Sequence, residues 1–267
     1  MLHRNENQSG VIFDTYWSEL PKDGRLVFRQ LERNRYFYQL IGKYIYSLGE
    51  KPKVLEVGCG TAIDSYYLQN KFDVKCSALD CSEAGLKQAQ AMGKYFDKGI
   101  ILVKGSIEKA PFGDNAFDLI FSQGVMEHFS NPSLAYLEQK RILKKNGIMV
   151  VHVPQKYNIY SLLQLFVQMY GKERPYHVDT FNQIAKKFDL ELIAVKGENI
   201  LSIEFLRFCY SQFIGPGFKH YSEKLTGFPW FVSRIVTIVE EGLWRLFGKY
   251  FGKYYMMNIV GVFRKRE

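Results

Sequence analysis

The feature that most constrains the fold is a regular alternation of short apolar runs and helical patterns between residues 53 and 154. The apolar runs have the length of strands, and the segments between them place apolar residues three and four positions apart. Strands that alternate with helices form a parallel sheet with helices on both faces, joined by right-handed crossovers. The predicted strands are KVLEV (53–57), VKCSALD (74–80), IILVKG (100–105), FDLIFSQG (117–124) and IMVVHVP (148–154). The predicted helices are TAIDSYYLQNKF (61–72), SEAGLKQAQAMGKYF (82–96) and SLAYLEQKRILKK (133–145).

The alternation stops after Pro154 and returns towards the C-terminus. TFNQIAKKF (180–188) predicts a helix, LELIAVKGE (190–198) a sixth strand, and NIVGVF near the end a last strand. We therefore predict an α/β fold with a doubly wound, mostly parallel, seven-stranded, Rossmann-like sheet, into which an aromatic, mainly helical lobe is inserted.

This pattern divides the chain into a sheet domain and the segments around it. Residues 51–199 and 256–267 form the α/β domain, and residues 1–50 form a helical N-terminal segment. Residues 200–255 are a helical insertion rich in aromatic and basic residues, and residues 155–178 are a second cap segment.

Two glycines and an acid follow the first two strands, at the edge where ligands bind in such sheets. Gly58 and Gly60 can take backbone angles that let a ligand approach the chain closely. Asp80 comes twenty positions after Gly60, a spacing typical of a carboxylate that accepts hydrogen bonds from ribose hydroxyls. Alone, the loop is a tight turn, a dinucleotide site or a site for a sulfonium cofactor. Ile63 stands where a dinucleotide-binding loop has its third glycine, which weighs against a nicotinamide cofactor.

Several motifs occur in a fixed order along the predicted sheet. They are Glu56-Val57-Gly58-Cys59-Gly60, Asp80, Pro111-Phe112, Phe117-Asp118-Leu119-Ile120 and Glu127-His128. Together they resemble the class I S-adenosylmethionine-dependent methyltransferase family, over roughly residues 35–155. The pattern is most similar to the small-molecule branch typified by ubiquinone- and menaquinone-biosynthesis methyltransferases. The resemblance implies an enzyme whose α/β domain binds S-adenosyl-L-methionine and releases S-adenosyl-L-homocysteine.

The same resemblance assigns roles to residues of the cofactor site. Glu56 orients the loop near the sulfonium and amino end of the cofactor, and Asp80 holds both ribose hydroxyls. The remaining cofactor contacts are Gly58, Cys59 and Gly60 along the methionine part and the ribose, Cys81 beside the adenine, and Gln123 at the methionine part.

The chain departs from the family pattern after the third strand. The family usually has an acid there that meets the adenine amine, whereas this chain has Gly105-Ser106-Ile107. Ser106 is neutral and shorter, so the resemblance leaves that contact to Ser106 or to the backbone of Ile107. The resemblance also implies that the N-terminal segment folds over the cofactor as a lid. Tyr16 and Trp17 belong to this lid, or they pack on the surface of the sheet.

Two histidines are candidates for a general base, a group that a methyl acceptor needs only when it must lose a proton. His128 follows Glu127 just beyond the fourth strand, where it acts as a base or shapes the loop by hydrogen bonding. His177 precedes a predicted helix, where it faces the active site or stays in a surface loop. The four cysteines include no CxxC pair, and we predict no metal site.

The insertion between residues 200 and 255 raises the question of partners. Its apolar residues recur at helical spacing over 229–255, which suits a membrane surface, a second subunit of a homodimer or the protein's own core. The chain has a net charge of +9, with ten basic and four acidic residues between Arg207 and Glu267. These basic residues are scattered among apolar ones and form no nucleic-acid-binding motif, so we predict no nucleic-acid partner.

We predict a methyltransferase that acts on a small or lipid-linked acceptor, at oxygen. The alternatives are a non-catalytic interaction protein that binds the cofactor, and an NAD-dependent oxidoreductase, which Ile63 disfavours. The N-terminal sequence MLHRNENQSG lacks the apolar core of a signal peptide. We therefore expect a cytoplasmic protein, with the inner membrane face as a further location if residues 229–255 contact lipid.

Overall fold

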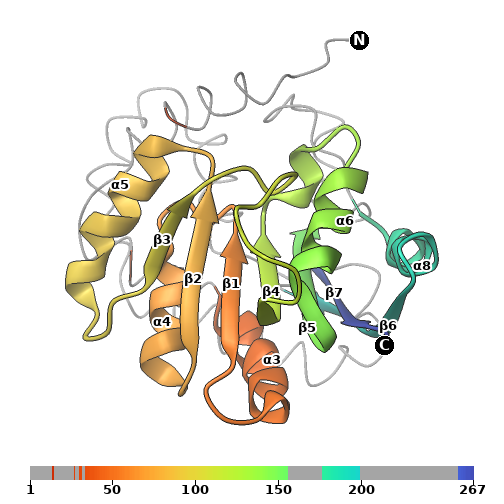
Figure 1. Ribbon diagram of the computed structural model, residues 1–267, viewed down its shortest axis with the longest axis horizontal. Coiled ribbons are helices and arrows are strands. Elements are labelled where there is room, and N and C mark those ends of the chain that lie inside the picture. The colour runs from red at the N-terminus through yellow and green to blue at the C-terminus, as the bar shows by residue number, and fades with distance from the viewer. Residues whose placement is uncertain (1–13, 15–26, 28–29, 32–33, 156–175, 199–257) are drawn as a thin grey trace, which may run out of the picture.

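A computed structural model describes residues 14, 27, 30–31, 34–155, 176–198 and 258–267 of the 267-residue chain. Seven strands form one sheet in the order β3-β2-β1-β4-β5-β7-β6 (Figure 1). The strands are β1 (Lys53–Val57), β2 (Lys75–Asp80), β3 (Ile101–Lys104), β4 (Phe117–Gln123), β5 (Leu143–Pro154), β6 (Leu190–Glu198) and β7 (Asn258–Lys265). The described α-helices are α3 (Arg35–Ile45), α4 (Ile63–Lys71), α5 (Glu83–Met92), α6 (Ser133–Ile142) and α8 (Val178–Lys187).

The sheet is parallel except at β7. β1 pairs in parallel with β2 and β4, β2 with β3, and β4 with β5, whereas β7 runs antiparallel to both β5 and β6. The chain therefore leaves β1 first towards one edge and returns to its other side at β4, so β1 and β4 flank the switch point where ligands bind in such folds. The structure confirms the predicted seven-stranded, mostly parallel Rossmann-like sheet.

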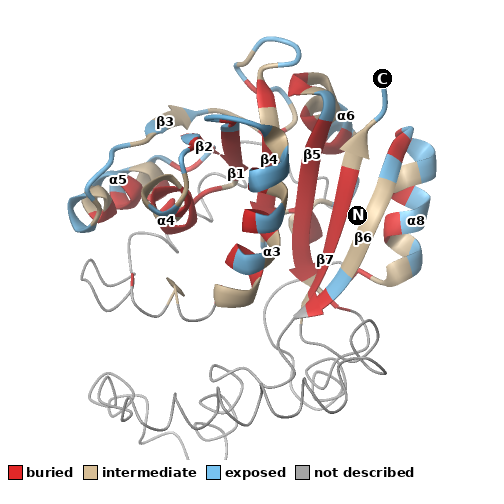
Figure 2. Cartoon of the chain, turned by 90° about the horizontal axis from the view of Figure 1, so that it is seen from below, coloured by how far each residue is buried: buried red, intermediate tan, exposed pale blue. Residues whose placement is uncertain are grey.

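Alternating side chains of the strands are covered by different helices. On one face Val54, Phe121 and Val150 pack with residues of α3 and α4, and on the other Leu55, Val151 and Phe263 pack with residues of α6 and α8. Both layers are buried, which is why the central strands are nearly continuous apolar runs in the sequence. Figure 2 shows this burial running along most of β5 and β7.

One predicted boundary is wrong by several residues. The helix expected over 133–145 ends at Ile142, and β5 begins at Leu143. Leu143 pairs with Phe117, yet the next paired residue of β5 is Ile148, opposite Leu119. The residues between them bulge out of the ladder at Asn146, whose φ of 61° lies in the left-handed region. The Asn-Gly pair that predicted a helix stop is therefore a turn inside the strand.

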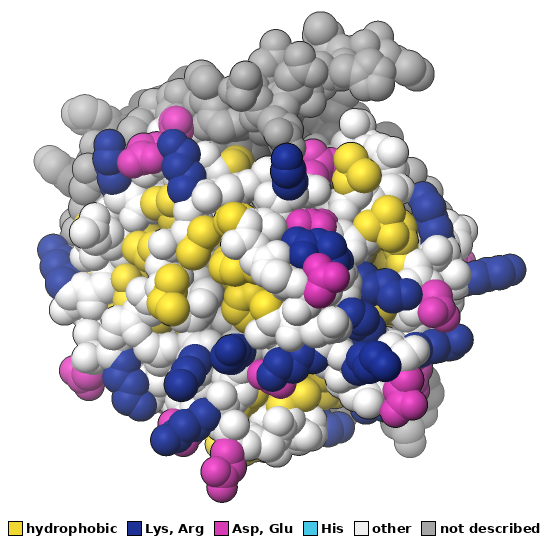
Figure 3. Space-filling model, in the orientation of Figure 1, with side chains coloured by type: hydrophobic (Ala, Val, Ile, Leu, Met, Phe, Trp, Pro, Cys, Tyr) yellow, Lys and Arg dark blue, Asp and Glu magenta, His cyan; other side chains and the backbone are white. Residues whose placement is uncertain are grey.

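The predicted domain boundaries remain a prediction. The insertion 200–255 and all but the ends of the cap segment 155–178 lie outside the described residues. In the part of the chain that the structure does describe, no helix is both long and apolar enough to cross a membrane. Figure 3 shows the side of the molecule that faces the viewer in Figure 1, where Lys and Arg side chains are interspersed with Asp and Glu over the described surface.

Candidate active site

The glycine loop leaves β1 through a run of left-handed residues. Gly58 and Gly60 have φ values of 68° and 48°, and Ala62 has a φ of 51° directly before α4. The backbone N–H groups of Gly58 and Cys59 both donate to the carbonyl of Leu79 at the end of β2, at 2.8 and 3.1 Å. A Cβ at position 58 would lie 2.4 Å from a methyl carbon of Val125, so only glycine fits there without a shift.

Asp80 organises the carboxyl end of β2 and is only 6% exposed. Its Oδ2 accepts the N–H of Gly60 at 2.7 Å, and its Oδ1 accepts the N–H of Ser82 at 2.8 Å. Burial raises the pKa of this carboxyl, and the hydrogen bonds from Ser82 and Gly60 oppose that rise. Each carboxylate oxygen accepts two hydrogen bonds, so Asp80 can still accept from two further hydroxyls.

Glu56 is buried in β1 on the face covered by α4. Its Oε2 accepts both the N–H and the hydroxyl of Ser65, at 3.1 and 2.6 Å. Desolvation, and next the nearby charge of Asp64, raise the pKa of Glu56 well above its usual value, while the bonds from Ser65 oppose the rise. Glu56 therefore connects the strand to the first turn of α4, behind the glycine loop.

Asp64 is a third buried acid, and the sequence patterns did not mark it as a site residue. It lies in the first turn of α4, 2% exposed. Asn34 donates to its Oδ1 at 2.8 Å, the Tyr38 hydroxyl donates to the same oxygen, and Gln30 donates to its Oδ2 at 3.0 Å. The only signal in the sequence was an acid four positions after Gly60, and only the structure shows that the start of this helix is buried.

Gln123 ends β4 beside the glycine loop, because its neighbour Ser122 pairs with Val57 of β1. Its Oε1 accepts a hydrogen bond from Asn34 at 2.7 Å. Its Nε2 is buried and donates to no group among the described residues. Gln123 therefore brings one unused donor to the switch point of the sheet.

The third-strand residues are less directly placed for binding. Ser106 accepts the N–H of Glu108 at 3.1 Å, which forms a local turn, and Ile107 is 8% exposed within the core beneath α6. Cys81 is exposed after Asp80, whereas Cys59 is buried in the loop, and burial raises the pKa of its thiol well above the usual range. The roles predicted for these residues remain predictions.

The two candidate bases lie on the same edge of the sheet as the loop. His128 is half-buried in a 3-10 turn (Met126–His128) just after β4. His177 follows Tyr176, which pairs with Gln155 at the end of β5, and its Nδ1 accepts the N–H of Asp179 at 3.4 Å to cap α8. The capping bond occupies Nδ1 of His177, which disfavours it as a base. The roles of both histidines remain predictions, and Tyr16 and Trp17 lie outside the described residues.

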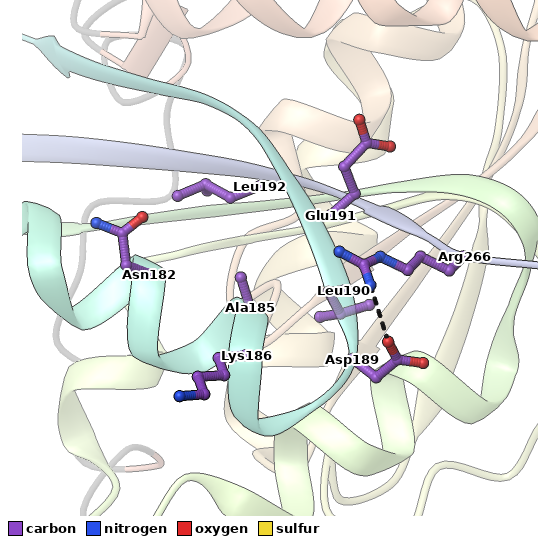
Figure 4. A pocket seen from close by; sticks show the side chains of 8 residues that line it. All are labelled: Asn182, Ala185, Lys186, Asp189, Leu190, Glu191, Leu192 and Arg266. Atoms are coloured by element: carbon purple, nitrogen blue, oxygen red, sulfur yellow. Dashed lines mark hydrogen bonds and ion pairs between the residues drawn. The ribbon is translucent and has the colours of Figure 1, made fainter.

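A surface hollow of about 450 Å³ lies away from this edge, between α8 and β6 (Figure 4). Two of its lining residues give its position: Leu190 is the first residue of β6, and Arg266 directly follows β7. Both lie at the opposite edge of the sheet from the glycine loop. Arg266 pairs with Asp189 there at 3.3 Å. The hollow therefore takes no part in the candidate active site.

Comparison with known proteins identifies a domain within the chain. Residues 55–151 match the family model described as a methyltransferase domain. This segment is therefore a methyltransferase domain, in agreement with the class I S-adenosylmethionine-dependent type that the sequence motifs resemble. Sequence similarity extends to sarcosine/dimethylglycine N-methyltransferase from Halorhodospira halochloris, 30% identical over 111 residues, which are 41% of this chain and 40% of that one. Malonyl-[acyl-carrier protein] O-methyltransferase from Herminiimonas arsenicoxydans is 31% identical over 114 residues, 42% of this chain and 41% of that one.

The methyltransferase domain is the part that these relatives share, since the chain matches about two fifths of their length. A crystal structure of a putative sarcosine dimethylglycine methyltransferase from Galdieria sulphuraria has the same fold, with a TM-score of 0.60 and 19% identity. That likeness covers 87% of this chain and 86% of the other.

The buried acids of the methyltransferase domain fit the cofactor of its family. S-adenosylmethionine carries a sulfonium and an ammonium group, and its ribose donates two hydroxyls. Within the described ranges, Glu56, Asp64 and Asp80 form no ion pair with Lys or Arg, and every hydrogen bond to them comes from a neutral group. Buried carboxylates without a cation are costly, and a cationic ligand would lower that cost. No group of His, Cys, Asp and Glu among the described residues is placed to hold a metal ion.

Proposed function

We propose that this protein transfers the methyl group of S-adenosylmethionine to an oxygen atom of a small or lipid-linked acceptor. The observation that carries this proposal is the set of three buried acids, Glu56, Asp64 and Asp80, around a glycine loop at the switch point of the sheet. The negative field of these acids suits a ligand with positive charge at one end and a ribose diol in the middle.

The residues of the site divide the work of binding and alignment. When bound, S-adenosylmethionine supplies an electrophilic methyl group on a good leaving group. Asp80 has acceptor positions left for the ribose hydroxyls, and the loop from Gly58 to Gly60 leaves room for the cofactor beside β1. The carboxyl groups of Glu56 and Asp64 are buried beside the loop, and in their ionised form they favour the cationic end of the ligand. Alignment and exclusion of water then supply most of the rate acceleration.

A hydroxyl acceptor needs a base, because it must lose its proton as the new bond forms, whereas an ionised carboxylate acceptor does not. His128 lies beyond β4 at the edge of the sheet where the loop lies, and we propose that it takes this proton. The two named relatives methylate nitrogen in one case and oxygen in the other by their names, so the family itself allows either atom.

The aromatic composition of residues 200–255 supports a small apolar or lipid-linked acceptor. We propose that residues 229–255 bring the protein to a membrane surface on the cytoplasmic side, where such an acceptor resides. Sedimentation with vesicles of anionic and of neutral lipid tests this surface, and a homodimer that forms without lipid would assign the same residues to a subunit interface instead.

Calorimetric titration with S-adenosylhomocysteine tests the cofactor site. Asp80→Asn removes the charge that faces the ribose, and we expect roughly ten- to hundredfold weaker binding. Asp118→Asn is the matched control, because Asp118 pairs with Lys144 at 2.8 Å and accepts the N–H of Lys53 at the other end of β1. Absence of binding to the unmodified protein at millimolar ligand, or equal losses in both variants, would contradict the proposed site.

Transfer of radioactive methyl groups tests the reaction. We expect label from S-adenosylmethionine to enter the lipid-soluble fraction of a cell extract, in a bond stable to the conditions that hydrolyse methyl esters of proteins. Binding of the cofactor without any labelled product in lipid or aqueous fractions would favour a non-catalytic binding protein. Quenching of NADH fluorescence at micromolar protein would favour an oxidoreductase.

A further inference from the structure

We propose that Asn34 is a positioning residue that fixes the carboxamide of Gln123 with its NH₂ group turned towards the cofactor, where it donates to the carboxylate at the amino-acid end. The inference rests on the proposed function, because the cofactor supplies the carboxylate. It assigns a task to a side chain at the start of α3, far in sequence from the glycine loop.

The carboxylate of Asp64 fixes which atoms its neighbours present to it. This carboxylate receives donors from three side chains, Gln30, Asn34 and Tyr38. An ionised carboxylate can only accept hydrogen bonds. The amide of Asn34 must therefore present its nitrogen, and not its oxygen, to Asp64.

The nitrogen of Asn34 also contacts Gln123. Nδ2 lies 2.8 Å from Oδ1 of Asp64 and 2.7 Å from the side-chain oxygen of Gln123. An amide NH₂ group has two hydrogens, enough to donate to both of these oxygens. Asn34 is only 4% exposed, which keeps water from competing for either bond.

The orientation of Gln123 follows from that of Asn34. Because Asn34 donates the hydrogen bond, Gln123 must accept it with Oε1, and the NH₂ group of Gln123 points away from Asn34. That Nε2 atom is buried and has no acceptor among the described residues. The backbone of Gln123 leaves β4 next to the start of the glycine loop, since the preceding residue Ser122 pairs with Val57. A buried donor without an acceptor is costly, and a ligand carboxylate at this place removes the cost.

The inference predicts selectivity within the cofactor. S-adenosylhomocysteine has the amino-acid end, whereas 5′-methylthioadenosine has the same adenosine and thioether without it. Loss of the Asn34 bond lets the Gln123 amide turn, so that its oxygen faces the ligand carboxylate for part of the time. Affinity for S-adenosylhomocysteine should then fall, while affinity for 5′-methylthioadenosine stays constant.

Titration of both ligands by calorimetry measures this selectivity. For Asn34→Leu and for Gln123→Leu we expect roughly ten- to hundredfold weaker binding of S-adenosylhomocysteine, and less than about twofold change for 5′-methylthioadenosine. The double variant should lose no more than Gln123→Leu alone, since both changes remove one interaction. Asn70→Leu is the matched control, because Asn70 makes its bonds to Tyr66, Asp97 and Lys98 at the far end of α4.

Three outcomes would overturn the inference. Equal losses for both ligands would give Asn34 a purely structural role, and additive losses in the double variant would separate it from Gln123. Unchanged binding of S-adenosylhomocysteine by a folded variant would remove the contact altogether. If thermal unfolding shows that Asn34→Leu does not fold, Gln123→Leu decides the selectivity, because it leaves the three side-chain bonds to Asp64 in place. Failure of the unmodified protein to bind either ligand would instead overturn the proposed function.

Discussion

The two halves of the sheet use buried polar groups in opposite ways. Beside the glycine loop, Glu56, Asp64 and Asp80 are buried with neutral partners, and burial raises the pKa of Glu56 and of Asp80. In the half formed by β5, β7 and β6, apolar and aromatic side chains such as Phe181 and Phe263 dominate the core, with His152 of β5 as a buried polar exception, and carboxylates form ion pairs at the surface. Under the proposed function, the first half bears a cost in stability that a bound cofactor offsets, whereas the second half mainly supplies stability.

Two glycines offer the sharpest test of this comparison, because each is packed too closely for a Cβ. A Cβ at Gly58 would lie 2.4 Å from Val125, and one at Gly261 would lie 2.5 Å from the buried ring of Phe181. Overpacking of this kind costs about 1–3 kcal/mol of unfolding free energy, and the left-handed φ at Gly58 adds about 1 kcal/mol. We expect Gly58→Ala and Gly261→Ala to destabilise the protein similarly in urea titrations.

Only the first of these variants should lose cofactor affinity beyond the effect of unfolding. Gly99→Ala is the control, because nothing lies within 4 Å of the added carbon. We expect S-adenosylhomocysteine to bind Gly261→Ala and Gly99→Ala as it binds the unmodified protein, at a temperature where all are folded. Weakened binding in Gly261→Ala would show that the two halves are coupled, contrary to the comparison.

The buried acids should also give the first half a distinctive pH dependence. Because the pKa of Glu56 is raised in the folded protein, the folded state holds a proton that the unfolded state has lost between the two pKa values. The free energy of unfolding therefore falls as pH rises from the ordinary value of about 4.5 towards the raised value. Asp80 contributes with the same sign.

Replacing Glu56 by Gln removes one source of this dependence. The amide oxygen can still accept from Ser65, so we expect little change in stability at pH 5, and a gain relative to the unmodified protein at pH 8, measured by urea midpoints. Affinity for S-adenosylhomocysteine should fall in the same variant. If Glu56→Gln lost as much unfolding free energy between pH 5 and pH 8 as the unmodified protein does, Glu56 would be ionised over that whole range, contrary to the prediction.

The sequence predicts the fold well because its signals are local. The strand β1 was predicted with the same bounds that the structure shows, since a buried parallel strand is a continuous apolar run between polar turns. The start of β5 was missed because the bulge at Asn146 depends on pairing with Phe117 and Leu119, which are distant in sequence.

The cofactor site is predictable only in part, for the same reason. Gly58, Gly60 and Asp80 follow from the loop and its spacing to the next strand. Asn34 does not, because its bonds reach residues 30 and 89 positions away, and nothing in its local sequence marks it. Contacts between the helix α3 and the loops of the sheet exist only after folding, so a single sequence carries no pattern for them.

The smallest effect is expected at the surface of the second half, and its sign completes the comparison. Glu191 and Arg264 face each other across β6 and β7, with their charged atoms 3.3 Å apart and both side chains nearly half exposed. Such a pair contributes about 0.2–1 kcal/mol and is screened by salt. Glu191→Gln should therefore lower the free energy of unfolding slightly in low salt and not at all in 1 M NaCl.

The two acids should thus differ in sign. Loss of the surface acid Glu191 lowers the free energy of unfolding, whereas loss of the buried acid Glu56 raises it at pH 8. Equal signs at the two sites would mean that both acids contribute to stability and that neither is held for binding.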